Sequence, residues 1–178
     1  MKLPVGVEIK PALGRIITAS YLLSIDWHQV LDCVRCVGYT LRPNGYCLLP
    51  EIKQRIQTLK RTIPGLVVVI NSYCHCPEFR TAVLAVPDPE IDYKIVTDER
   101  VGPRGKLAAL QSITRKECSI LHIDDCAEIL SEFNTAGRVK DARLHQFGIT
   151  VPRKGRKNPQ QRAQGIQYYR NVLEALDS

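Results

Sequence analysis

The sequence lacks a hydrophobic run long enough to cross a bilayer. Its longest apolar stretches, such as residues 66–70 and 119–123, are far shorter than the roughly 18 residues that a membrane-spanning helix needs. The first nine residues include Lys2, Pro4 and Glu8 where a secretory signal would have an apolar core. These absences predict a soluble, intracellular protein, cytoplasmic or, as an open alternative, nuclear.

The sequence also lacks the marks of a disulfide scaffold and the length for a large second domain. Its seven cysteines are an odd number in a chain that is not a small secreted scaffold, so reduced thiols are the better interpretation. At 178 residues and 44% hydrophobic, the chain can bury one sizeable core. We expect one α/β domain over residues 1–150, then a basic linker and C-terminal helix over 151–178.

Positive charge is concentrated in this tail. Residues 151–178 hold six basic and two acidic side chains, so the tail carries a net charge of +4 out of the +7 of the whole sequence. Residues 152–159 are basic and contain glycine and proline, so we expect them to be extended and solvated. Residues 160–176 have the apolar spacing of a helix. The tail can dock on its own domain, on another subunit or on a protein partner, and its basic run can contact nucleic-acid phosphates.

Apolar segments of strand type alternate with segments of helical type. Expected strands cover residues 16–25, 66–70, 93–97, 119–123 and about 142–147. Expected helices cover about 50–63, 77–86 and 127–133, and a further one follows a turn at 102–106 and runs through residue 113. Residues 33–49 predict an irregular loop or a short hairpin. This order predicts a three-layer, Rossmann-like α/β fold with helices on both faces of a parallel sheet.

Polar side chains follow three of the expected strands. Asp26 comes after the first, Asn71 and Ser72 after the second, and Asp124 and Asp125 after the fourth. Because the carboxyl ends of parallel strands meet at one edge of a sheet, these segments are predicted to converge there.

These segments resemble the four ordered motifs of the haloacid dehalogenase (HAD)-like superfamily, of its small or capless phosphatase type. The motifs are Asp26 followed by Val30-Leu31, then Ser72, then Lys106 at a helix start, then Asp124-Asp125. The resemblance spans roughly residues 17–147 and rests on order, strand context and spacing together. It implies a phosphohydrolase with a HAD-like fold.

The resemblance implies a role for each residue. Asp26 would attack a phosphoryl group and form an aspartyl phosphate, since its carboxylate is already ionised at neutral pH. Ser72 and Asn71 would bind the phosphate, and Lys106 would bind it too while neutralising charge on Asp26.

The implied cofactor is Mg²⁺. It would be held by Asp26, Asp124 and Asp125, because a hard cation prefers carboxylate oxygens, and Asp125 is the preferred direct ligand of the last pair. The chain leaves room for little or no cap, which favours a phosphomonoester carried on a large molecule.

His28 is where the sequence departs from the resemblance. Phosphatases of this superfamily usually carry a second aspartate at this position, which protonates the leaving group and later activates water. Histidine has an ordinary pKa near 6.5 and can serve as the acid and base instead. His28 is therefore a predicted catalytic residue. The alternative is a catalytically impaired binding or regulatory module, in which this change has ended turnover.

A zinc site is a third interpretation. Cys33 and Cys36 follow the first strand, and Cys74, His75 and Cys76 follow the second, so five zinc-type ligands can meet near one sheet edge. Such a site would suit a zinc-stapled nucleic-acid-binding domain. The commoner explanation is that free cysteines are small buried residues. His122 is expected to be a core histidine.

Overall fold

A computed structural model describes most of the first 130 residues and three shorter segments after them. The described residues are 3, 5–11, 14, 16–27, 39–42, 45–48, 50–74, 77–102, 104–115, 117–124, 126, 129–130, 147–150, 166–168 and 172–177.

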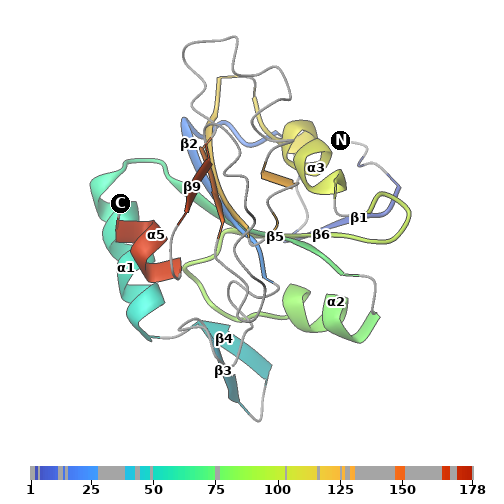
Figure 1. Cartoon of the computed structure of the whole chain (residues 1–178), viewed down its shortest axis with the longest axis horizontal. Helices are drawn as coiled ribbons and strands as arrows, with labels where there is room; N and C mark the ends of the chain where they lie inside the picture. The colour runs from blue at the N-terminus through green and yellow to red at the C-terminus, as the bar shows by residue number, and fades with distance from the viewer. Residues whose placement is uncertain are drawn as a thin grey trace.

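A β-sheet lies at the centre of the fold (Figure 1). It has seven strands, in the order β1-β6-β5-β2-β7-β8-β9. The strands are β1 (Val7–Lys10), β2 (Tyr21–Ile25), β5 (Val67–Tyr73), β6 (Tyr93–Thr97), β7 (Ser119–Asp124), β8 (Phe147–Thr150) and β9 (Ile166–Tyr168). The edge strand β1 is antiparallel to β6, and the other neighbouring pairs are parallel. A separate hairpin, β3 (Tyr39–Arg42) and β4 (Gly45–Leu48), follows β2 in the chain. The predicted parallel α/β sheet is confirmed.

The described helices are α1 (Pro50–Thr62), α2 (Pro77–Leu84), α3 (Gly105–Ile113) and α5 (Val172–Asp177). Helix α1 begins at a proline, whose fixed φ suits a first turn, and it buries Ile52 and Ile56 on one face. Helix α5 lies against α1 (Figure 1), where Arg55 Nε donates to Leu176 O at 3.0 Å. None of the helices in the described ranges is long and apolar enough to span a membrane.

Two apolar clusters cover the two faces of the sheet. On one face, Ile25 packs with Ile52 of α1 and with residues of α2 and α5. On the other, Leu22 packs with Leu110 of α3. Successive side chains of a strand point to opposite faces, so β2 contributes alternately to the two clusters. The three-layer arrangement is the predicted one.

The strand order reverses at β2. Strands β5 and β6, which follow β2, lie on one side of it, and β7, β8 and β9 lie on the other. In open α/β sheets, ligands bind outside the carboxyl ends of the strands at such a reversal. The ends of β2 and β7 are therefore where the fold places a site.

Several element boundaries differ from the expectation. The expected strand over 16–25 begins at Tyr21, and β8 lies at 147–150 instead of 142–147, whose first five residues are outside the described part of the chain. The edge strand β1 was not predicted, because its alternation of apolar and polar residues extends over only four positions, of which one is buried. The hairpin β3–β4 agrees with one of the two forms expected for 33–49.

The expected helix over residues 160–176 is wrong at 166–168, which form β9. Backbone pairing of this segment with β8 overrides its helical spacing, and spacing carries no record of a pairing partner. The C-terminal part of the expected helix is confirmed, since residues 172–177 form α5. The domain boundary at residue 150 stays a prediction; β8 and β9, on either side of it, are neighbours in the sheet.

Candidate active site

Predicted site residues lie at the carboxyl ends of the central strands. Asp26 directly follows β2, and its N–H donates to Ile123 O at 2.8 Å, which keeps it beside β7. Asp124 is the last residue of β7, and Ser72 lies near the end of β5. Asp26 is 2% exposed and Asp124 is fully buried. The fold thus brings these segments, distant in sequence, to the expected edge.

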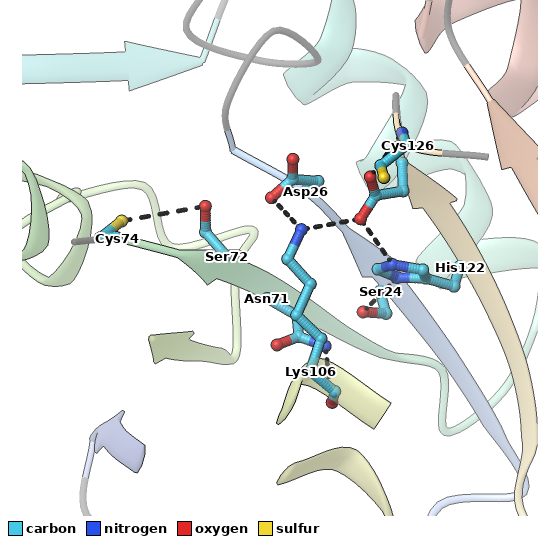
Figure 2. A network of polar contacts seen from close by, with 9 residues as sticks. Ser24, Asp26, Asn71, Ser72, Cys74, Lys106, His122 and Cys126 are labelled. Atoms are coloured by element: carbon cyan, nitrogen blue, oxygen red, sulfur yellow. Dashed lines mark hydrogen bonds and ion pairs between the residues drawn. The ribbon is translucent and has the colours of Figure 1, made fainter. Parts of the chain in front are cut away.

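Lys106 joins the two carboxylates. Its Nζ lies 2.7 Å from Asp26 Oδ1 and 2.7 Å from Asp124 Oδ2 (Figure 2). One ammonium is shared by two carboxylates, so the three side chains together carry a net negative charge. Because they are withdrawn from water, each charge interacts with its partners far more strongly than it would at the surface.

The start of α3 positions Lys106. The turn before the helix uses Gly102 at a positive φ of 65°, where glycine is unstrained. A Cβ on Gly105 would lie 2.8 Å from the Cβ of Val101, so the chain packs here at a distance that only glycine permits. Asn71 Nδ2 donates to the backbone oxygen of Lys106 at 3.2 Å and ties this helix start to β5.

Burial and charge act in opposite directions on the pKa values of this group. Burial lowers the pKa of Lys106, but the charges of Asp26 and Asp124 outweigh burial and hold that pKa above its ordinary value. Burial raises the pKa of Asp124, but the charge of Lys106 and the hydrogen bond from His122 hold it below its ordinary value. Lys106 and Asp124 are therefore both charged at neutral pH.

His122 and Ser24 extend the contacts into the sheet. His122 Nε2 lies 3.0 Å from Asp124 Oδ2, and its Nδ1 lies 2.9 Å from Ser24 Oγ (Figure 2). Burial lowers the pKa of His122 more than its contact with Asp124 raises it, so the imidazole is neutral at pH 7. His122 is the expected core histidine, but its contact with Asp124 was not predicted. The available signal was its position two residues before Asp124, on the same face of one strand.

Asn71 and Ser72 point to opposite faces of β5. Asn71 faces α3, as its bond to Lys106 requires. Ser72 lies on the face of Cys74, whose Sγ is 3.9 Å from Ser72 Oγ. The phosphate-binding roles of Asn71 and Ser72 stay predictions.

Several predicted residues fall outside the described part of the chain. They are His28, Asp125, Cys33, Cys36, His75 and Cys76. Cys74 is described and buried. Within the described residues, no group of three or more His, Cys, Asp or Glu side chains is arranged to hold a metal ion.

Comparison with known proteins bears on the fold. No protein-family model and no curated protein matches the chain. A crystal structure of a candidate HAD-like phosphatase from Mesorhizobium loti matches with a TM-score of 0.52 and 16% identity, over 98% of this chain and 94% of that chain. At this identity the likeness concerns the fold alone, and it supports a Rossmann-like α/β architecture similar to that of a HAD-like protein.

Proposed function

We propose that the chain is a Mg²⁺-dependent phosphohydrolase of the HAD-like type, which cleaves a phosphomonoester through an aspartyl phosphate on Asp26. The observation that carries the proposal is the Lys106 ammonium, bound 2.7 Å from both Asp26 and Asp124 at the edge where the strand order reverses. The structural neighbour, described as a candidate HAD-like phosphatase, supports it.

The reaction uses Asp26 as nucleophile. An oxygen of Asp26 forms a bond to phosphorus while the bond from phosphorus to the leaving oxygen breaks, and that oxygen takes up a proton. Water then cleaves the aspartyl phosphate and releases inorganic phosphate. Lys106 holds the Asp26 carboxylate in place and neutralises negative charge during the transfer, and Ser72 donates its hydroxyl to a phosphoryl oxygen.

The described donor set fits Mg²⁺, which is commonly bound through one or two carboxylates and keeps several waters. Asp124 Oδ2 already accepts from Lys106 and His122, whereas among the described residues its Oδ1 accepts only from Cys126 N, at 2.8 Å. A carboxylate oxygen accepts about two bonds, so Oδ1 retains a free position. Asp26, Asp124 and the predicted ligand Asp125 would hold the ion, which supplies Lewis-acid stabilisation of phosphoryl charge.

The substrate proposed is a phosphomonoester on a large molecule. The described insertion between β2 and α1 is the short hairpin β3–β4, which is small beside a cap domain. The basic residues of 152–159 would contact a phosphorylated macromolecule, either a nucleic acid or a protein partner. A 5′-phosphorylated oligonucleotide and a phosphopeptide, compared at equal concentration, distinguish these two.

Metal removal tests the proposal directly. We expect p-nitrophenyl phosphate to be hydrolysed with Mg²⁺ present, and the rate to fall by at least about 100-fold in excess EDTA, because phosphoryl charge then loses its strongest stabilisation. Added Mg²⁺ in excess of the chelator should restore the rate. Hydrolysis that EDTA leaves unchanged would exclude the metal-dependent mechanism.

The second candidate, a binding module without turnover, is favoured by one observation, the histidine at position 28. In the first candidate His28 moves the proton. We then expect His28→Asp to raise kcat by about 10-fold, a small part of the roughly 100- to 10,000-fold that a positioned acid–base group contributes. His28→Asn, which cannot carry the proton, should lower kcat. An inert native protein that His28→Asp activates would instead establish the second candidate.

A further inference from the structure

Two polar side chains, Ser24 and His122, lie inside the sheet behind Asp124. They face each other in the parallel register of β2 and β7, and both are fully buried. The pair two residues earlier in these strands, Leu22 and Ile120, is apolar, as expected for a sheet covered on both faces. A polar pair at such a position is unfavourable unless every group finds a partner, and it calls for a specific explanation.

The direction of the hydrogen bond between His122 and Asp124 follows from their chemistry. The carboxylate of Asp124 only accepts, so the Nε2 of His122, 3.0 Å from Oδ2, must donate to it. The other ring nitrogen, Nδ1, lies 2.9 Å from the hydroxyl of Ser24, which can donate or accept. The imidazole is therefore held at both ring nitrogens, with a hydrogen pointing at Asp124.

Three donors fix the orientation of the Asp124 carboxylate. His122 and Lys106 donate to Oδ2, and the N–H of Cys126 donates to Oδ1. Lys106 is a long, flexible side chain that can follow a rotating carboxylate. The Cys126 bond leaves the carboxylate free to turn about one oxygen. Of the two Oδ2 donors, the imidazole is the rigid one, because it is held by the sheet and by Ser24.

We propose that His122 is a positioning residue, which with Ser24 fixes the carboxylate of Asp124 beside Lys106 and Asp26. This inference rests on the proposed function, in which Asp26 must meet phosphorus in line and Asp124 must present its free Oδ1 position to Mg²⁺. Hydrogen bonds that orient metal ligands and reacting groups from behind commonly affect both metal affinity and rate.

Two substitutions at His122 separate positioning from filling the space. Glutamine can place an amide N–H near the position of Nε2 and keep the bond to Asp124. Asparagine is too short for that and reaches only toward Ser24. We expect His122→Asn to lower kcat on p-nitrophenyl phosphate by about 10- to 100-fold with little change in KM, and His122→Gln to stay within about threefold of the native value.

The second readout is Mg²⁺ affinity, measured by calorimetry on the metal alone. His122→Asn should weaken it by about 10- to 100-fold and His122→Gln by much less. Ser24→Ala should lower kcat by a smaller factor, and the double variant Ser24→Ala/His122→Asn should be no worse than His122→Asn, since both act through one contact. Thr114→Val is the control: it removes a buried hydroxyl that donates to Leu110 O at 2.7 Å in α3, and it should leave kcat unchanged.

The outcomes separate this inference from the proposed function. If the native protein turns over and the folded Asn and Gln variants lose kcat and Mg²⁺ affinity equally, the positioning role is wrong. If the native protein binds Mg²⁺ without turnover and only His122→Asn weakens binding, hydrolysis fails and the positioning of Asp124 stands. A native protein that neither binds Mg²⁺ nor turns over contradicts both.

Discussion

Asp26→Asn is expected to abolish phosphomonoester hydrolysis and to leave the protein folded and no less stable. The amide has nearly the shape of the carboxylate but is not a nucleophile, so no aspartyl phosphate forms and kcat falls by at least about 1,000-fold. The same change removes one of the two carboxylates that share Lys106. The buried group then holds one positive and one negative charge, and the cost of burying an excess charge disappears.

The measurement combines a rate with a melting temperature. Native protein and Asp26→Asn are compared on p-nitrophenyl phosphate with Mg²⁺, and thermal unfolding is followed on the same samples. Asp177→Asn is the matched control, because Asp177 is exposed and its partner is Arg55, at 2.8 Å. That variant should keep full kcat, with stability within about 1 kcal/mol of native, as for other exposed ion pairs. Turnover retained in Asp26→Asn would show that the nucleophile lies elsewhere.

The sequence predicts those site residues that lie at the ends of recognisable strands. Residues 66–70 are almost all β-branched, and a run of this kind with polar residues after it can be identified as a buried strand without any knowledge of its neighbours. The same holds for the segments that end at Asp26 and Asp124. Because parallel strands share one carboxyl edge, order and strand ends were enough to bring these carboxylates together.

Contacts that depend on register or on a helix start could not be predicted in this way. The bond between His122 and Ser24 exists because β2 and β7 pair in one particular register, which no local pattern records. The reach of Lys106 depends on the close approach of Gly105 to Val101. The resemblance to known motifs indicated Lys106, but a sequence carries no measure of the distance from this lysine to either aspartate. Strand β9 was not predicted for the same reason as the contact between His122 and Ser24, because both depend on which strands pair.

Of the variants proposed, Lys106→Met is expected to show the largest decrease in the free energy of unfolding. Methionine fills a similar volume without the ammonium, so Asp26 and Asp124 remain buried with no cation between them. Breaking a buried ion pair from one side typically costs about 3 to 5 kcal/mol, because the charge left behind is uncompensated. Chemical denaturation of native protein and variant measures the difference in the free energy of unfolding. A loss below about 1 kcal/mol, the size of an exposed pair, would contradict the buried arrangement.

A second substitution distinguishes loss of charge from loss of packing. Lys106→Met/Asp26→Asn removes one of the two uncompensated carboxylates and leaves the volume nearly unchanged. We expect the double variant to be more stable than Lys106→Met alone, although Asp26→Asn adds no new contact. If instead the two changes add without any recovery, the damage in Lys106→Met comes from packing of the methionine and not from charge.

The pH dependence of the unfolding free energy gives an independent check, because between pH 4 and pH 7 the carboxylates should lower the stability of the variant but not that of the native protein. The pKa of Lys106 is raised on folding, so its contribution is complete below its unfolded pKa of about 10.4 and is lost as pH rises through the folded value. The pKa of Asp124 is lowered, so its contribution is present above about pH 4 and is lost as pH falls through the folded value. Between these limits Lys106 and Asp124 contribute a constant stability to the native protein, and the lowered pKa of His122 adds a loss of stability as pH falls below about 6.5.

In Lys106→Met, burial and mutual repulsion raise the pKa of the two carboxylates, and each then disfavours folding once it ionises. The difference in unfolding free energy between native protein and variant should therefore be larger at pH 7 than at pH 4. A packing defect has no such dependence, so a difference that stays constant over this range would show that the charges of Asp26 and Asp124 do not meet at Lys106.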